Sequence, residues 1–260
     1  MKTIKFLGTA GARFVVAKQL RASGGIWFSL DGTNFLVDPG PGSLIRCLTS
    51  RPKLEPTDLD GIILSHRHLD HANDVNLMVE AMTTGGFQNK GTLFAPADAL
   101  DGEPVVFRYI RDYVDKVEVL KENTSYRLKG VTFSTRRRHR HPVETYGFKF
   151  LLPGLSVSLI TDTRLFPELI EDYQSDIAII NVVLLRSIPD FPIDHLSVED
   201  VKQLVTWIRP RLAILTHFGM NIVKAKPWKI ARSIEEETGI KVIAARDGMT
   251  VLLDDFTTIQ

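Results

Sequence analysis

The most constraining feature of this chain is the run Ser-His-Arg-His-Leu-Asp-His at residues 65–71. Its three histidines and one aspartate come directly after an apolar, β-like run at 61–64. A strand that ends in such a run can direct several side chains to one place beyond the sheet. Imidazole and carboxylate groups together suit zinc, manganese or iron better than calcium or magnesium. The run therefore predicts a metal site at a strand end, with a polar turn that binds no metal as the alternative.

Short β-like runs alternate with helix-like segments along the chain. Apolar spacing predicts helices at 43–48, 73–82, 104–114, 167–173, 198–208 and 227–238. We expect Asn73 and Asp74 to cap the second of these helices, Ser197 to cap the fifth, and Gly239 to end the last. Blocks of strands with helices between them predict an α/β protein in which two mixed sheets pack face to face with helices outside. We expect this four-layer αβ/βα sandwich to form one domain over residues 1–260.

Three residues outside the first run have a similar local context. Asp162 and His217 lie at the ends of apolar, strand-like runs, and His141 precedes such a run. Taken alone, a histidine at a strand end is more often a hydrogen-bonded structural residue. Together with the first run, these three residues predict a larger metal site assembled from several strand ends.

The order of these residues makes the chain similar to the metallo-β-lactamase fold hydrolases. The similarity rests on His66-x-His68-x-Asp70-His71 and extends, with the residues named above, from residue 1 to about 253. Asp38, in Leu-Val-Asp-Pro-Gly, matches the structural aspartate of that family.

This resemblance implies two divalent metal ions, with zinc as the first expectation and manganese or iron as alternatives. The implied ligands form two groups joined by a bridging Asp162: His66, His68 and His141 for one ion, and Asp70, His71 and His217 for the other. A hydroxide between the ions would be the nucleophile. Two cations lower the pKa of a shared water and neutralise charge on the attacked centre.

Within that family, three features are similar to ribonuclease Z and to the cyclic phosphodiesterase of phosphonate breakdown. Tyr-Gly-Phe begins a strand after His141, Asp162 stands in an Asp-Thr pair, and His195 lies in Asp-His-Leu-Ser before a helix. The similarity implies a phosphodiesterase that acts on nucleic acid or on a small cyclic or diester phosphate. Asp70 and His195 would be catalytic, with His195 contacting phosphate or acting as general acid. Alternatively, His195 braces the helix that follows it.

Other activities of the same fold stay open. The chain has no evident exosite arm of the kind that ribonuclease Z uses to grip tRNA, and its single cysteine excludes the cysteine-rich insert of the cyclic phosphodiesterase. A thioester or lactone hydrolase and an iron-dependent sulfur dioxygenase are the alternatives. Thioesterases and sulfur dioxygenases of this fold typically place their next histidine in Gly-His-Thr-x-Gly-His, which is absent around His141. A metal-binding scaffold without activity is the third possibility.

Composition excludes some partners. The net charge is +1, from 32 basic and 31 acidic residues, so no field of the whole molecule attracts nucleic acid or an anionic membrane. No apolar run approaches the roughly 20 residues that span a bilayer, and the N-terminus does not read as a secretory signal. We therefore expect a cytoplasmic protein without membrane contact, and a homodimer by default. The single cysteine, Cys47, is expected to be buried and unpaired.

Two further segments could contact a phosphate-bearing substrate. The run Arg-Arg-Arg-His-Arg at 136–140 could clamp phosphate, although such runs are often solvated loops, and we expect His139 to be structural or solvent-facing. The run Gly-Thr-Ala-Gly-Ala at 8–12 lacks the Gly-Lys-Ser/Thr of a P-loop and predicts a tight turn.

Overall fold

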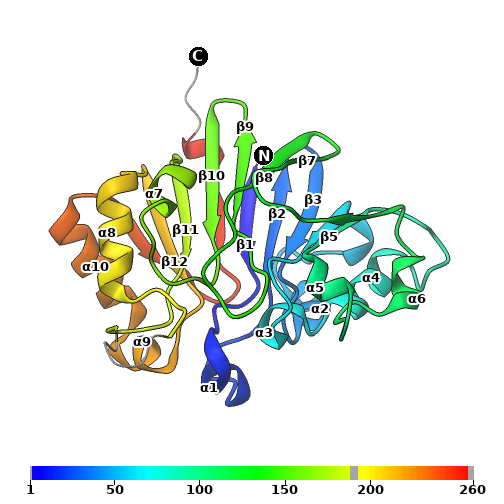
Figure 1. Ribbon diagram of the computed structural model, residues 1–260, viewed down its shortest axis with the longest axis horizontal. Helices are drawn as coiled ribbons and strands as arrows, with labels where there is room; N and C mark the ends of the chain where they lie inside the picture. The colour runs from blue at the N-terminus through cyan, green and yellow to red at the C-terminus, as the bar shows by residue number, and fades with distance from the viewer. Residues whose placement is uncertain (1, 188–192, 257–260) are drawn as a thin grey trace.

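Two mixed β-sheets form the centre of the structure, a computed structural model that describes residues 2–187 and 193–256 (Figure 1). The first sheet has the strand order β14-β1-β2-β3-β4-β5-β6, with β1 at Thr3–Phe6, β2 at Ile26–Leu30, β3 at Thr33–Val37, β4 at Gly61–Ile63, β5 at Thr92–Ala95, β6 at Lys116–Val119 and β14 at Thr250–Leu252. The second has the order β13-β12-β11-β10-β9-β8-β7, with β7 at Ser125–Leu128, β8 at Val131–Thr135, β9 at Phe148–Leu152, β10 at Leu155–Ile160, β11 at Ile177–Asn181, β12 at Leu212–Thr216 and β13 at Val242–Ala244.

The two sheets share one pairing layout. In the first, β14, β1, β2 and β3 pair antiparallel, and β3 to β6 continue in parallel. In the second, β7 to β10 pair antiparallel, and β10 to β13 continue in parallel. The two halves of the chain thus repeat one arrangement of strands.

Aromatic side chains fill the space between the sheets. Phe28 and Phe35 of the first sheet stack with ring centroids 4.9 Å apart. Phe150 of the second sheet lies 5.0 Å from Phe28 and 5.3 Å from Phe35, which joins the two halves. Along β9, buried Phe148, Phe150 and Leu152 alternate with more exposed residues, as the two-residue period of a strand requires.

Helices cover the outer face of each sheet (Figure 1). The first sheet carries α2 at Ser43–Thr49, α4 at Val75–Met82, α5 at Ala97–Leu100 and α6 at Arg108–Arg111. The second carries α7 at Leu169–Asp172, α8 at Val198–Ile208, α9 at Met220–Ala225 and α10 at Pro227–Thr238. Short helices α1, Ala12–Ala17, and α3, Leu69–Ala72, lie at one end of the sandwich, and single 3₁₀ turns lie at Pro56–Asp58 and Asp254–Phe256. The predicted four-layer fold is confirmed.

Among the described residues, no helix combines the length and the hydropathy needed to cross a bilayer. The expectation of one domain over 1–260 includes residue 1, 188–192 and 257–260, which lie outside the described residues.

Helix ends follow the sequence where a cap is present. Ser197 accepts from the Asp200 backbone N–H, and the Asp200 carboxylate accepts from the Ser197 N–H, so the predicted start of α8 is confirmed. Gly239 ends α10 with φ of 69°. The prediction that Asp74 caps α4 through its side chain is wrong. Asp74 stands at the N-cap position, but its side chain accepts no hydrogen bond from the first turn of the helix. Its Oδ2 instead accepts from the Gly42 N–H at 3.0 Å, which ties α4 to the loop before α2.

The predicted helix at 104–114 is wrong over most of its length. The Val105 and Val106 N–H groups both donate to the Ala99 carbonyl of α5, at 3.1 and 3.2 Å, and this bonding holds them outside a helix. Only Arg108–Arg111 is helical there. The predicted helix at 167–173 is likewise reduced to Leu169–Asp172.

The core between the sheets gives a direct test of the fold. Replacing fully buried Phe150 by Ala is expected to lower the free energy of unfolding by about 3–5 kcal/mol, because a cavity opens between four neighbouring rings. The matched control is Leu151→Ala on the same strand, where the side chain is 53% exposed. Urea unfolding followed by circular dichroism measures both, and equal losses would contradict the packing described.

Candidate metal centre

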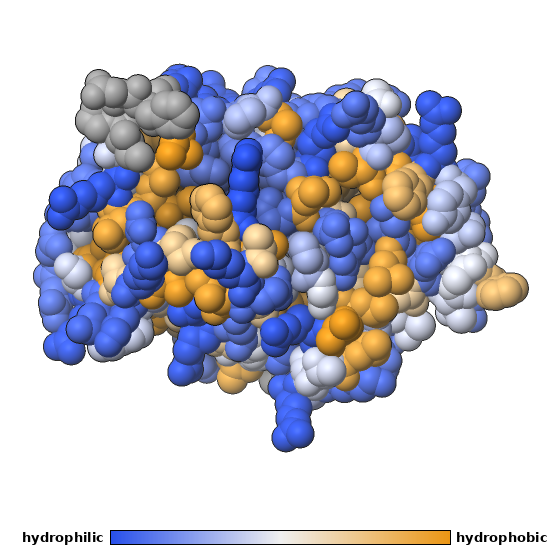
Figure 2. All heavy atoms as spheres, turned by 90° about the horizontal axis from the view of Figure 1, so that it is seen from below, coloured by the Kyte–Doolittle hydropathy of each residue, from blue (hydrophilic) through white to orange (hydrophobic). Residues whose placement is uncertain are grey.

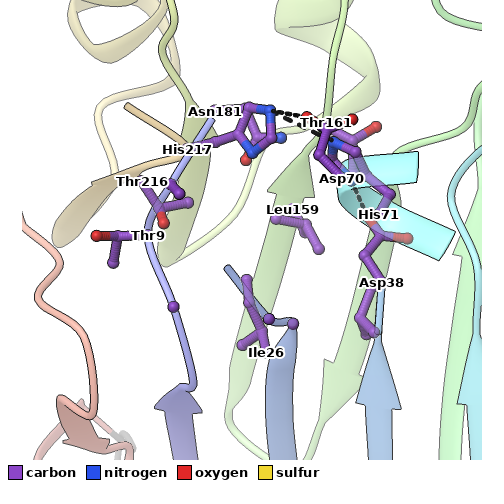
Figure 3. Close-up of a pocket in the computed structure, with 15 residues that line it drawn as sticks. Thr9, Ile26, Asp38, Asp70, His71, Leu159, Thr161, Asn181, Thr216 and His217 are labelled. Atoms are coloured by element: carbon purple, nitrogen blue, oxygen red, sulfur yellow. Dashed lines mark hydrogen bonds and ion pairs between the residues drawn. The ribbon is translucent and has the colours of Figure 1, made fainter. Parts of the chain in front are cut away.

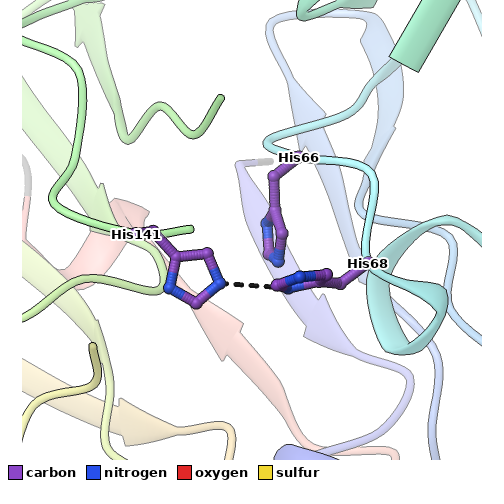
Figure 4. Close-up of side chains that lie close together, drawn as sticks. All are labelled: His66, His68 and His141. Carbon is purple, nitrogen blue, oxygen red and sulfur yellow. Dashed lines mark hydrogen bonds between the residues drawn. The ribbon is translucent and has the colours of Figure 1, made fainter. Parts of the chain in front are cut away.

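Three histidines meet where the loop after β4 approaches the loop before β9. His66 and His68 follow the buried strand β4, and His141 comes from the opposite half of the molecule (Figure 4). One ring nitrogen of each lies within 4.8 Å of one from each of the others, and His141 Nε2 lies 3.0 Å from His68 Nδ1. The spacing suits three ligands on one ion.

A second group lies beside the first. Asp70 and His71 stand in the short helix α3, and His217 follows β12 (Figure 3). Asp162 follows β10. His71 Nε2 lies 3.3 Å from His217 Nε2, and Asp70 Oδ2 lies 3.4 Å from His217 Nε2. All four of these residues therefore turn a nitrogen or oxygen toward one place.

Asp162 lies between the two groups. Its Oδ2 is 3.4 Å from Nε2 of both His71 and His217, and 4.0 Å from Nε2 of His66. Its other oxygen accepts a hydrogen bond of 2.8 Å from Asn181 Nδ2. Asn181 thereby fixes which carboxylate oxygen faces the histidines, as a bridging ligand would need.

Hydrogen bonds around the histidines fix where their lone pairs point. The Ser65 hydroxyl donates to Asp38 Oδ2 at 2.6 Å, so its oxygen, 2.9 Å from His66 Nδ1, accepts the proton of that nitrogen. Asp38 Oδ2 also accepts from His71 Nδ1 at 2.9 Å. The Asp194 carbonyl accepts from His141 Nδ1 at 3.0 Å. With Nδ1 protonated in this way, the neutral form of each of these rings directs the lone pair of Nε2 inward.

This arrangement fits metal ions. His66 Nε2 is buried without a hydrogen-bond partner, and the inward nitrogens of His71 and His217 face each other. Buried polar atoms normally have partners, and lone pairs that face one another repel unless a cation lies between them. Nitrogen and carboxylate donors of this kind suit zinc, manganese or iron.

The charges around His71 also favour a bound cation. Burial opposes a charge on its ring, yet Asp70, Asp162 and Asp38 together raise the pKa of His71 well above its ordinary value. Burial also opposes a charge on Asp162, but His217, His195 and His71 hold the pKa of this carboxyl well below its ordinary range. The carboxylates thus create a negative potential that a divalent cation would satisfy better than a single proton.

Burial keeps the three imidazole rings of the first group of donors neutral. It lowers the pKa of His66 well below its ordinary value, and it lowers the pKa of His68 and His141 as well. A neutral imidazole is the form that binds a metal ion.

Backbone geometry brings two chain segments unusually close at the centre. His217 has φ of 58°, a conformation that only a small fraction of non-glycine residues adopt. A Cβ on Gly11 would lie 2.2 Å from the His217 carbonyl oxygen, so only glycine fits there. The N–H groups of Thr9 and Ala10 both donate to the Ala22 carbonyl at 3.0 Å. The segment at 8–12 is therefore close-packed, and these two donors are not free to hold phosphate. The predicted tight turn is wrong, because Ala10 forms an isolated β-bridge with Phe218 and Gly11 is extended.

His195 reaches the centre from a loop before α8. Its Nδ1 lies 3.5 Å from Asp162 Oδ2, and its ring centroid lies 5.2 Å from that of His141. The capping of α8 is made by Ser197 and Asp200 alone, so the bracing alternative finds no support in the side-chain contacts. His195 thus joins the predicted ligands without belonging to either group of donors.

Two guanidinium groups of the arginine-rich run make structural contacts. Arg137 pairs with Asp172 at 3.2 Å, and the Arg140 guanidinium lies 5.0 Å from the centre of the Phe166 ring. His139 is buried, with Nε2 2.8 Å from the Tyr173 hydroxyl, and burial lowers the pKa of His139 to about 3. The structural expectation for His139 is confirmed.

Several supporting residues were not singled out from the sequence. Ser65 bonds Asp38 across 27 positions, and the Asp194 carbonyl bonds His141 across 53, which no local pattern records. Asn181 left a signal, because it is the one polar residue of the otherwise apolar β11. Cys47 is buried and unpaired as expected.

Comparison with known proteins agrees with this geometry. The pattern of the beta-lactamase superfamily domain matches residues 33–218, which include every predicted ligand. The chain belongs to this superfamily. An uncharacterized protein of Methanocaldococcus jannaschii is 30% identical over 259 residues, covering 96% of this chain and 94% of that protein. A ribonuclease Z of Kineococcus radiotolerans is 29% identical over 156 residues, covering 57% of this chain and 47% of that protein.

Solved structures place the chain in the metallo-β-lactamase fold. The metallo-β-lactamase fold protein YhfI from Bacillus subtilis has a TM-score of 0.78 at 18% identity, with 96% of this chain and 98% of that one covered. A diphosphatase of the PhnP family has a TM-score of 0.71 at 19% identity, with 96% of each chain covered. The predicted family and fold are therefore confirmed, and the family implies divalent metal ions at the His and Asp groups.

The hydroxyl of Ser65 gives a test that does not depend on activity. Ser65→Ala removes the acceptor of the His66 Nδ1–H, so the ring is free to adopt the wrong tautomer or orientation. We expect zinc affinity to fall about 10- to 100-fold, as for other residues that orient metal ligands. Competition with a chromogenic chelator measures the affinity, with Ser233→Ala on exposed α10 as control. Unchanged zinc affinity in a folded Ser65→Ala variant would show that the tautomer is fixed in another way.

Proposed function

We propose that this protein is a dinuclear metal-dependent phosphodiesterase. The observation that carries the proposal is the place of His195, whose Nδ1 lies 3.5 Å from the carboxylate oxygen set between the two groups of donors. Phosphoryl chemistry needs a further side chain beside the two groups of metal donors. Such a side chain gives a proton to the leaving oxygen or makes an extra contact with the phosphate. The ribonuclease Z and PhnP-family diphosphatase likenesses support the same class of substrate.

Each predicted residue has a task in this proposal. His66, His68 and His141 would hold one ion, and Asp70, His71 and His217 the other, with Asp162 between them. When bound, two divalent ions lower the pKa of a shared water and neutralise charge on the attacked phosphate. Asp38 and Asn181 would keep the donors in place through the hydrogen bonds described above.

His195 is suited to deliver a proton. Its ring is 18% exposed, so a proton given to a leaving oxygen can be replaced from solvent. Burial lowers the pKa of His195, and the Asp162 carboxylate only partly opposes this effect, so the protonated ring would need the negative charge of a bound phosphate to favour it. Asp70 would serve as a ligand, since its Oδ2 approaches His217, and its catalytic role stays a prediction.

The surface at this end of the sandwich can receive an organic substituent of the phosphate. Figure 2 shows this end, where hydrophobic patches interrupt a largely hydrophilic face. Phe14 of α1 is 67% exposed, and Leu69, directly before Asp70, is 69% exposed. The exposed apolar side chain of Leu69, next to Asp70 in the chain, favours a diester with organic groups over inorganic phosphate. The nature of those groups, the homodimer and the cytoplasmic location stay predictions.

Asp162→Ala tests the proposed activity. With protein loaded in turn with zinc and manganese, we expect hydrolysis of bis(4-nitrophenyl) phosphate to fall at least about a hundredfold in kcat/KM, because several kcal/mol of charge stabilisation depend on the bridging position. Glu236→Ala on exposed α10 is the control. No turnover by wild-type protein shown to carry two ions, together with cleavage of a thioester or lactone, would contradict the phosphodiesterase proposal.

His195→Ala separates a general acid from a phosphate contact. A general acid contributes about 10²- to 10⁴-fold where the leaving group is poor, and far less where it is already stable as an anion. We therefore expect the variant to lose much more kcat on a dinucleotide diester than on the 4-nitrophenyl diester. Equal losses on both substrates would assign His195 to phosphate contact alone.

A further inference from the structure

A second cavity lies beside β1, on the side away from the core between the sheets. Ile4 and Phe6 point into that core, so Lys5 between them points to the outer face. There Lys5 lines a cavity of about 240 Å³ together with Arg46 and Arg51. A water molecule takes about 30 Å³ in the liquid, so this space has room for a small molecule.

Lys5 brings a charge into this cavity without a counter-charge. Its side chain is only 4% exposed. Its Nζ donates to the Arg51 carbonyl at 3.1 Å and to Thr250 Oγ1 at 3.2 Å, which uses two of its three protons. Among the described residues, no carboxylate lies within ion-pair distance of Lys5, and none lines the cavity. Buried charges are normally paired, so the third proton calls for an anion.

Two guanidinium groups add to this charge. Arg46, in the last turn of α2, and Arg51 both line the cavity, and neither pairs with a carboxylate within the described parts of the chain. A guanidinium offers parallel N–H donors that match the oxygens of a phosphate group, while an ammonium adds a compact point charge. Three cations without an acid around one cavity therefore favour a group with two negative charges over a single carboxylate.

We propose that this cavity binds the phosphate group of a small phosphorylated molecule through Lys5, Arg46 and Arg51. The site is separate from the metal centre, because none of the predicted metal ligands lines it. The proposal does not depend on the proposed phosphodiesterase activity, since it rests on residues of the outer face alone. The size of the cavity leaves space for an organic part beside the phosphate.

Calorimetric titration of the full chain, stripped of metal with a chelator, tests the proposal. The probes are ribose 5-phosphate and inorganic phosphate at low salt, with ribose as the uncharged control. We expect both phosphates to bind, and Lys5→Met, which keeps the stem and removes the charge, to weaken binding about tenfold or more. Arg46→Gln, on an exposed side chain, should weaken it too, and circular dichroism verifies folding of each variant. Tighter binding of ribose 5-phosphate than of inorganic phosphate would assign the remaining space to the organic part.

Two further variants separate this cavity from other sites. Lys241→Met on the exposed surface and Asp162→Ala at the metal centre should leave phosphate binding unchanged. Absence of binding in wild-type protein would overturn the proposal. So would binding that survives in folded Arg46→Gln and Lys5→Met but disappears in Asp162→Ala, because the anion would then lie at the metal centre.

Discussion

The carboxylate of Asp38 orders more of the candidate centre than any single predicted ligand does. It accepts from the Ser65 N–H and the Ser65 hydroxyl, both at 2.6 Å, and from His71 Nδ1 at 2.9 Å. One residue thereby sets the tautomer of His71 directly and that of His66 through Ser65. Asp38 itself follows β3 with φ of 53°, a conformation that costs backbone energy and persists only where its contacts hold it. Charge-assisted hydrogen bonds are the strongest of their kind, and here they hold one donor of each group.

Much of the candidate centre could be predicted from local sequence. His66, His68, Asp70 and His71 lie in one run after a strand, and a strand end is where a sheet presents ligands. Asp162 and His217 were found by the same reasoning, because each follows an apolar run whose burial the structure bears out. The fold was predictable for a related reason, since apolar runs mark the strands and apolar residues at helical spacing mark the longer helices.

What could not be predicted depends on contacts between distant segments. The link from Asp38 to Ser65 spans 27 positions, and that from Asn181 to Asp162 spans 19. The failure at 104–114 has the same cause, because Ala99 competes for N–H groups that the apolar pattern assigned to a helix. The cavity at Lys5 was missed as well, since a lysine in the first strand carries no local sign that its charge is left without a partner.

The position of the centre relates its ions to the stability of the sandwich. His66 and His68 extend from the first sheet, whereas His141, Asp162 and His217 extend from loops of the second. An ion held by His66, His68 and His141 would cross-link the two sheets at one end, and so would an ion held by His71, Asp162 and His217. The aromatic core fixes the sheets along their length, while at this end polar donors replace apolar packing. Because donors from both sheets would bind the same ions, the ions that would serve chemistry would also hold the two halves together there.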